Sequence, residues 1–557
     1  MSVDDEQGDE PGTRRSARID LALACAVAMG WLAALVATEP AFGLVWDEGY
    51  TVRRDRRLAG WLDGVIHAPS MAARADLFAP GPLAYGWPFA REEPDGHPPV
   101  YALIGVAGWS LTRGVLPPLS AYRFGPMVLC ALTAGVLCRH VARSRGRVAG
   151  VVAASLFLLM PRTFAHAHYA HYDMPMTCFW LLAMVGFDAS LRDRRWAVAA
   201  GVCLGLSAGS KFTGLFAAAP MVAWTLLFDR RGARPGLRAL AVVAPAAALT
   251  LYAVQPPWWL EPIGGPLRFL ASNLTRSWTK PVPTMYLGRV HEFSLPWHNT
   301  AVLTWAMTPT CVLIAAAMGT AAILARRRER PGAAIWPLSW ATLMVVRALP
   351  NAPGHDGVRL FLPSVATLAV LAGWAVGCGR GWLRRAHVGC ALGALAIVES
   401  AVGVAQTYPY TDSYFSAAVG GLPGAERTGF ELTYYWETLG PEFRRWVEAE
   451  ARRREVGLNI LIDETNPRLI REWGLLPAAA KLVGLDPTPR PDFVQQRRRS
   501  IYFPEDEWLE RRGRPRFAIR RQGVDLLRVY PFEQYVEALK ATRGERPAPH
   551  LNRGGPP

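Results

Sequence analysis

Residues 19–50 read IDLALACAVAMGWLAALVATEPAFGLVWDEGY, an apolar block followed closely by an acidic pair. The block from Ile19 to Thr38 can cross the hydrocarbon core of a bilayer, which takes about 20 apolar residues in a helix. It follows three arginines and lacks a convincing small-residue cleavage site, so we interpret it as an uncleaved first membrane helix rather than a signal peptide. Residues 1–18 are polar and are predicted to be a disordered cytoplasmic N-terminus.

Apolar blocks of similar character recur as far as residue 405. They lie at about 99–112, 119–138, 148–161, 174–191, 196–209, 212–228, 238–257, 300–325, 334–349, 359–377 and 386–405. The chain is 51% hydrophobic and has 21 Trp, which is more apolar surface than one soluble core needs. Residues 19–405 are therefore predicted to form a transmembrane domain.

Arginine clusters between the blocks assign the sides of the membrane. Cytoplasmic connectors should carry excess positive charge, which places 14–18, 139–147, 192–195, 230–238, 326–330 and 380–385 in the cytoplasm. Alternation fails only between residues 99 and 138, so we expect the 99–112 block to be re-entrant or interfacial. The chain then makes about eleven crossings, and residues 39–98 form the first outer loop.

The formal charge of +16 follows the same pattern. The arginines lie in short connectors and not along one amphipathic face, so membrane orientation explains the charge and no nucleic-acid partner is expected. All but four of the 61 basic residues are Arg, a composition typical of GC-rich bacterial genomes. We therefore expect a multi-pass protein of the bacterial inner (plasma) membrane.

The chain leaves the membrane at Gln406. Short β-like runs at 458–462, 517–519 and 524–529 alternate with a helical stretch at 441–453, which predicts a small extracytoplasmic α/β domain over residues 406–542. Residues 543–557 are rich in Arg and Pro and are predicted to be a disordered tail. The predicted fold class is an all-α polytopic membrane protein with this small C-terminal domain.

The first outer loop begins and ends with residues that can carry chemistry. Asp47 and Glu48 stand at the membrane surface, where an ionised carboxylate suits a general base, although a solvated helix terminus has the same pattern. His97 precedes Pro98 and Pro99, which hold the backbone extended. It could bind phosphate or metal, or cap the next helix.

The second outer loop is rich in histidine. Residues 161–175 contain His166, His168, His171 and Asp173, and imidazole and carboxylate groups are the usual ligands of divalent metals. The spacing His-x-His-x-x-His matches no closed metal site. A divalent metal ion is therefore left open as a cofactor, and the metal ligands stay unknown.

Two cations follow at the outer ends of later blocks. Lys211 lies between two apolar blocks, and the segment 351–359 brings His355 and Arg359 to the start of a helix. A charge at the bilayer centre costs about 2.5 to 3.5 kcal/mol, so these side chains either snorkel to the surface or pair with an anion. Neither has an obvious acidic neighbour at helical spacing, so we expect them to bind a phosphate of the substrate.

Together these motifs resemble the GT-C membrane glycosyltransferases, especially bacterial members of family 39, the protein-mannosyltransferase-like group that also resembles the lipid A aminoarabinose transferases. The residues that carry the resemblance are Asp47-Glu48, His97-Pro98-Pro99, Asp173, Lys211, Trp297-His298, Arg359-Leu360-Phe361-Leu362-Pro363, and the segment from Tyr408 to Glu437. The resemblance covers about residues 19–440. The aminoarabinose transferases carry Lys where this chain has His97.

The resemblance implies a GT-C-like fold and an activity. A sugar would move, with inversion, from a polyprenyl-phosphate donor to an unknown acceptor (a protein, lipid or glycan) at the outer face, among membrane lipids. Asp47 would be the general base, and Glu48 and Asp173 would orient the acceptor or an ion. The substrate-binding residues implied are His97, Lys211, His355, Arg359, His166, His171, Trp297 and His298.

A transporter or flippase of a lipid-linked or anionic substrate is the alternative. Such proteins tend to show internal repeats with interrupted helices at matching positions. We find no such repeat in the sequence, and the charged residues gather in loops assigned to one side. A non-catalytic scaffold would not need acids and bases from five separate loops.

Overall fold

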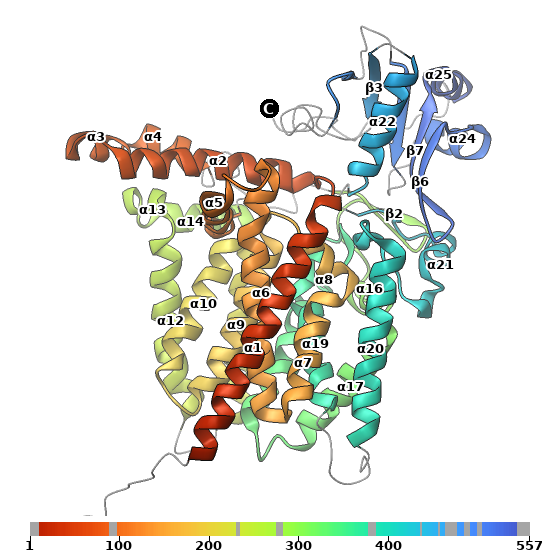
Figure 1. Ribbon diagram of the computed structural model, residues 1–557. Helices are drawn as coiled ribbons and strands as arrows, with labels where there is room; N and C mark the ends of the chain where they lie inside the picture. The colour runs from red at the N-terminus through yellow and green to blue at the C-terminus, as the bar shows by residue number, and fades with distance from the viewer. Residues whose placement is uncertain are drawn as a thin grey trace, which may run out of the picture.

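The computed structural model describes residues 11–88, 97–229, 234–274, 282–376, 386–434, 437–454, 457–462, 476–483, 491–497 and 504–542. Most of these residues lie in a bundle of apolar helices (Figure 1). The bundle helices are α1 (Pro11–Thr38), α6 (Pro118–Arg145), α7 (Arg147–Leu159), α9 (Asp173–Ser190), α10 (Trp196–Ser210), α11 (Ala218–Phe228), α12 (Pro235–Ala253), α17 (Thr310–Ala325), α18 (Ile335–Val346), α19 (Leu362–Val376) and α20 (Ala386–Thr407).

Length and composition support a membrane bundle. Within the described ranges, five helical segments are long and apolar enough to cross a bilayer: Arg15–Ala41, Pro118–Arg145, Pro235–Ala253, Gly357–Val376 and His387–Thr407. Other helices, such as Arg147–Leu159 and Thr310–Ala325, are apolar but shorter. The predicted all-α membrane fold is confirmed.

The first helix differs from the sequence prediction at its start. α1 begins at Pro11, so residues 11–18, which were predicted to be disordered, are helical. Arg, Ser and Ala continue a helix readily, and a helix can extend beyond the apolar block that spans the bilayer. Residues 1–10 and the tail 543–557, also predicted to be disordered, lie outside the described residues.

A layer of short helices covers one end of the bundle (Figure 1). We call this end, where α1 finishes at Thr38 and α2 (Trp46–His67) begins, the α2 end. α2, α3 (Met71–Asp76) and α4 (Pro80–Gly86) lie across it, beside α13 (Pro256–Leu260) and α14 (Gly264–Leu274). Their flat arrangement leaves the helix ends beneath them partly covered.

The helix α5 (Val100–Thr112) lies near the α2 end and packs against α2 and α6. Its 13 residues span about 20 Å, which is short of the roughly 30 Å hydrocarbon core. Glycines let α5 approach α6 closely, because a Cβ on Gly125 would lie 2.0 Å from the carbonyl oxygen of Ile104. This contact fixes the end of the first loop, where His97 stands.

The helix α19 forms the centre of the bundle. The segment Gly357–Val376, which includes the 3-10 helix η5 (Gly357–Phe361), is fully buried. Small residues permit close packing around it, as Gly319 of α17 shows: a Cβ there would lie 1.8 Å from the carbonyl oxygen of Leu371. Arg359 therefore stands at the end of the most enclosed helix.

The C-terminal residues form a small α/β unit at the α2 end (Figure 1). The described strands have the order β4-β3-β5-β7-β6, with bounds β3 Leu458–Ile462, β4 Ala480–Val483, β5 Phe493–Arg497, β6 Phe517–Arg521 and β7 Val524–Pro531. β3 pairs in parallel with β4 and β5, whereas β7 is antiparallel to β5 and β6. The helices α22 (Pro441–Arg454), α24 (Pro504–Arg512) and α25 (Phe532–Ala541) accompany the sheet. The predicted α/β fold is confirmed.

Specific contacts dock this unit on the bundle. Arg521 donates to the carbonyl oxygen of Tyr408, just after α20, and Gln522 donates to the side chain of Gln406 in α20 at 2.9 Å. Within the unit, Arg521 forms an ion pair of 2.9 Å with Glu442 of α22. Gln522 accepts the backbone N–H of Leu422, in α21 (Gly421–Thr428), at 2.9 Å. Arg521 and Gln522 lie where β6 ends and the turn to β7 begins, so that corner of the sheet is held against the membrane domain.

Orientation can be tested with single cysteines in a cysteine-free background. Exposed positions Ser70 and Asn351, at the α2 end by the Arg pattern, should react with a membrane-impermeant thiol reagent in intact cells. Exposed positions Arg194 and Arg328 should react only after the membrane is permeabilised. Labelling of the second pair alone in intact cells would reverse the proposed orientation.

Candidate active site

The guanidinium group of Arg359 joins three acids. Its Nε donates to Asp173 at 2.7 Å, one terminal nitrogen donates to Asp356 at 2.6 Å, and the other contacts Asp47. Arg359 is 4% exposed, and a buried cation of this kind is stable only when it is paired and hydrogen-bonded. The three acids come from the first turn of α2, the start of α9 and the turn before η5.

Lys211 binds the other carboxylate oxygen of Asp173. Its Nζ lies 2.6 Å from Oδ1 of Asp173, and it stands 4.9 Å from the ring centroid of Tyr172. Burial lowers the pKa of Lys211 to about 8, and the charge of Asp173 opposes that shift. Lys211 lies in the break between α10 and the 3-10 helix η3 (Phe212–Ala217), which points it toward the second loop.

These ion pairs correct one expectation from the sequence. Lys211 and Arg359 were expected to have no acidic protein partner, yet both bind Asp173, and Asp356 stands three residues before Arg359. The i, i+3 neighbour was visible in the sequence, whereas Asp173 and Asp47 are brought in by the fold. We name the set Asp47, Asp173, Lys211, Asp356 and Arg359 the ionised cluster.

Asp47 is the most accessible carboxylate of the ionised cluster. Its side chain is 25% exposed, compared with 0% for Asp173 and 5% for Asp356. It lies in the first turn of α2, where a negative charge is stabilised by the helix dipole. Arg359 and the hydroxyl of Tyr172 both contact its Oδ2 atom, so its orientation is fixed.

The neighbouring Glu48 points the other way. Its two oxygens accept from Arg123 of α6 at 2.7 and 2.6 Å, and one also accepts the backbone N–H of Ala170 at 2.7 Å. Arg123 also binds Glu39 at 2.8 Å. Glu48 is fully buried, so we interpret it as a structural residue and not as one that orients the acceptor.

Tyr172 connects the two outer loops. The ring of His97 stacks on it at a centroid distance of 3.5 Å, and its hydroxyl lies 2.8 Å from a terminal nitrogen of Arg359. Tyr101 meets Tyr172 edge-on at 5.7 Å. His97 is thus placed beside the ionised cluster by aromatic stacking, a contact that residue types alone do not predict.

The histidines of the second loop lie behind Asp173. The backbone N–H of Asp173 donates to Nδ1 of His171 at 3.0 Å, so neutral His171 carries its proton on Nε2 and directs it to His166, 3.1 Å away. Burial lowers the pKa of His171 to about 4, which keeps the ring neutral. The other nitrogen of His166 faces Asp412 at 3.4 Å.

Asp412 is a buried acid that the sequence interpretation missed. It is 1% exposed, and burial raises its pKa to about 7 while Arg162 acts in the opposite direction. Its backbone N–H donates to Glu437 at 3.2 Å. The segment from Tyr408 to Glu437 carried part of the family resemblance, which was the available signal that an acid there belongs near the site.

Other predicted residues have different surroundings. His168 lies 2.8 Å from the hydroxyl of Thr38 and stacks on Phe42, which indicates a structural role. Trp297 is 78% exposed, and the described contact of His298 is a 2.9 Å hydrogen bond with Tyr286. His355 is half-buried just before Asp356.

Metal ligands were left open by the sequence. Among the residues that the structure describes, no group of three or more His, Cys, Asp or Glu side chains is arranged to hold a metal ion. In the second loop, His166 and His171 bond to each other, and Lys211 and Arg359 occupy both oxygens of Asp173.

An ionised cluster at one end of an apolar helical bundle marks a functional site of a membrane protein. A family model described as dolichyl-phosphate-mannose-protein mannosyltransferase matches residues 96–259. That segment holds His97, Asp173 and Lys211 of the site. The resemblance to mannosyltransferase-like GT-C enzymes is thereby confirmed, and the chain is a glycosyltransferase.

Comparisons with solved structures give distant matches. The chain resembles ArnT from Cupriavidus metallidurans in the apo state with a TM-score of 0.49 and 14% identity, over 93% of this chain and 99% of that one. ArnT from the same organism bound to undecaprenyl phosphate gives a TM-score of 0.43 and 16% identity, over 91% of this chain and 97% of that one. The archaeal oligosaccharyltransferase AglB from Archaeoglobus fulgidus, with an inhibitory peptide and a dolichol-phosphate, gives 0.43 and 13%, over 82% and 64%. No curated protein gives a significant sequence match.

The buried Glu48–Arg123 pair should contribute more to stability than to chemistry. Glu48→Gln would remove one of the two carboxylates that pair with buried Arg123 and leave only Glu39, and breaking a buried pair costs up to about 3 to 5 kcal/mol. We therefore expect a clear drop in the thermal unfolding temperature of the purified protein, with Glu448→Gln on exposed α22 as the matched control. A stable Glu48→Gln protein without activity would instead assign Glu48 to the reaction.

Proposed function

We propose that this glycosyltransferase moves a sugar from a polyprenyl-phosphate donor to an acceptor hydroxyl, with inversion, at the outer face of the bacterial inner membrane. The observation that carries the proposal is Asp47, an accessible carboxylate fixed beside Arg359 and Tyr172 at the α2 end. The description of the matching family names dolichyl-phosphate-mannose as the sugar donor, and dolichyl phosphate is a polyprenyl phosphate. The acceptor class is not part of the proposal.

Asp47 is assigned as the general base. As the bond between the sugar and the phosphate lengthens, the sugar gains oxocarbenium character, and the acceptor hydroxyl becomes acidic as it attacks the opposite face. Asp47 then takes the hydroxyl proton. Its ion pair with Arg359 orients the carboxylate before the substrate arrives.

The phosphate is assigned chiefly to Lys211. The ionised cluster holds three carboxylates (Asp47, Asp173, Asp356) and two cations (Lys211, Arg359), so a phosphate enters a region with no excess of positive charge. An ammonium group has three donors, and the hydrogen bond to Asp173 uses one. Arg359 is bound to three acids and is better suited to positioning them.

Purified protein with a panel of polyprenyl-phosphate sugars and candidate acceptors tests the activity directly. Glycosylated product together with free polyprenyl phosphate is the expected result. If proteoliposomes move the intact donor across the bilayer and form no product, the chain acts as a flippase and the proposal is wrong.

Asp47→Asn removes the charge of the base while it keeps the shape of the side chain. Turnover should fall by about 10²- to 10⁴-fold, the usual contribution of a general base. Asp63→Asn is the matched control, because Asp63 lies on the same helix and its side chain is 69% exposed. Near-normal turnover of Asp47→Asn would mean that another group accepts the proton.

Lys211 and Arg359 should affect different kinetic constants. Lys211→Met should raise the donor KM about 10- to 150-fold, as expected for loss of a charge-assisted contact, with less effect on the acceptor KM. Arg359→Lys keeps the charge but loses the planar fork, so kcat should fall more than donor affinity. Lys211→Arg should restore part of the donor affinity. An unchanged donor KM in Lys211→Met would remove Lys211 from the phosphate site.

A further inference from the structure

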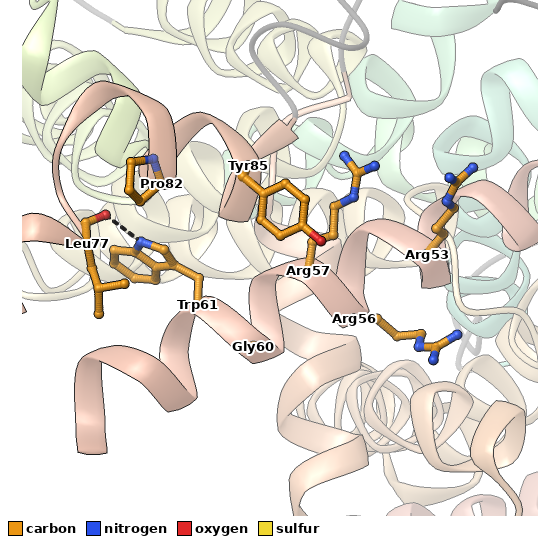
Figure 2. A pocket seen from close by; sticks show the side chains of 8 residues that line it. All are labelled: Arg53, Arg56, Arg57, Gly60, Trp61, Leu77, Pro82 and Tyr85. Carbon is orange, nitrogen blue, oxygen red and sulfur yellow. Dashed lines mark hydrogen bonds between the residues drawn. The ribbon is translucent and has the colours of Figure 1, made fainter. Parts of the chain in front are cut away.

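A cavity between α2 and α4 lies apart from the ionised cluster (Figure 2). Its volume is about 570 Å³, and its lining includes Arg53, Arg56, Arg57, Gly60, Trp61 and Tyr85. Pockets of this size accommodate small ligands or the polar part of a larger one. Arg53 stands six residues after Asp47, so it lies about 9 Å farther along the helix axis.

The arginines share one face of α2. Arg53 lies three and four residues before Arg56 and Arg57, and Gly60 lies three and four residues after Arg57 and Arg56, which places them along one side of the helix. The adjacent Arg56 and Arg57 diverge, and Figure 2 shows Arg56 pointing away from Arg57. Arg57 lies over the ring of Tyr85 at 5.1 Å, and Figure 2 shows these two side chains next to each other. The ring covers a face of the guanidinium group, whose donors point outward in its plane.

Trp61 is held in place on one side of the cavity, and Gly60 has no side chain to fill the space beside it. The indole N–H of Trp61 donates to the carbonyl oxygen of Leu77 at 2.8 Å, drawn as a dashed line in Figure 2. Trp61 also meets Phe78 and Trp87 at 5.0 and 5.5 Å. No atom lies within 4 Å of the place where Gly60 would carry a Cβ. The cavity is therefore formed before a ligand arrives.

The surroundings indicate which anion would reach it. α2, α3 and α4 lie across the end of the bundle (Figure 1), and they expose large apolar side chains: Ile66 at 67%, Met71 at 75% and Tyr85 at 67%. Basic residues next to exposed apolar ones on surface helices are typical of segments that rest in the head-group region of a bilayer. A phosphate at this depth belongs to a lipid.

We propose that the cavity between α2 and α4 binds the phosphate-bearing head group of an anionic membrane phospholipid. Arg53, Arg56 and Arg57 supply the positive charge, and the Trp61 wall fixes their spacing. This site is distinct from the donor site, and its occupancy does not depend on the proposed glycosyl transfer. A bound lipid would hold the same helix that presents Asp47.

Lipid binding can be measured by native mass spectrometry of the full chain. The protein should retain phosphatidylglycerol at concentrations at least tenfold below those needed for phosphatidylcholine. The triple variant Arg53→Gln, Arg56→Gln and Arg57→Gln should lose most of that preference. Each arginine near an anionic surface contributes about fivefold to the affinity. The charge-matched control is Arg444→Gln, Arg445→Gln and Arg452→Gln, on the exposed part of α22. It should keep the preference.

A second measurement keeps the test independent of the folding of the triple variant. Photoreactive phosphatidylglycerol should crosslink the wild-type chain at peptides of α2 or α4, and phosphatidylcholine in excess should not compete. Equal retention of the two lipids, or crosslinks confined to other helices, would overturn the proposal. So would displacement by millimolar inorganic phosphate without any effect of phosphatidylglycerol, since that would identify a site for a soluble anion.

Discussion

The placement of the site depends on the requirement that a buried guanidinium group be paired. Taking Arg359 out of water costs several kcal/mol, and the cost is offset only when Asp47, Asp173 and Asp356 all reach it. Asp47 comes from the first outer loop, Asp173 begins α9, and Asp356 precedes η5. Each of these segments is therefore tied to the same charge.

Two adjacent acids meet this requirement in different ways. Asp47 and Glu48 are consecutive residues in the first turn of α2, so their side chains diverge by about 100° around a helix with 3.6 residues per turn. Glu48 enters the bundle and binds Arg123, whereas Asp47 stays partly open toward the α2 end. The Glu48–Arg123 pair anchors α2. Asp47 therefore has a fixed position and one accessible face.

Residue types and local patterns were readable from the sequence, and long-range pairs were not. The blocks ending near 138, 191 and 405, and the strand at 458–462, correspond to helices and a strand of the structure. The chemistry was harder to assign, because Arg359 and Asp47 lie 312 positions apart and nothing local selects one partner over another. The pairing of Arg123 with an acid could have been predicted, since an Arg inside an apolar block needs a partner by default. For Asp412 the only signal was the family resemblance of the segment from Tyr408 to Glu437, because its burial follows from the docking of the segment after α20.

The division between a rigid centre and a covering layer has a functional consequence. Arg359 stands at the end of a fully buried helical segment, so the cation is the fixed point. Asp356 and Asp173 meet it from the turn before η5 and from the start of α9, and Asp47 meets it from the covering layer. For a reaction between a lipid-borne donor and a separate acceptor, such a reference point preserves the geometry while both substrates exchange.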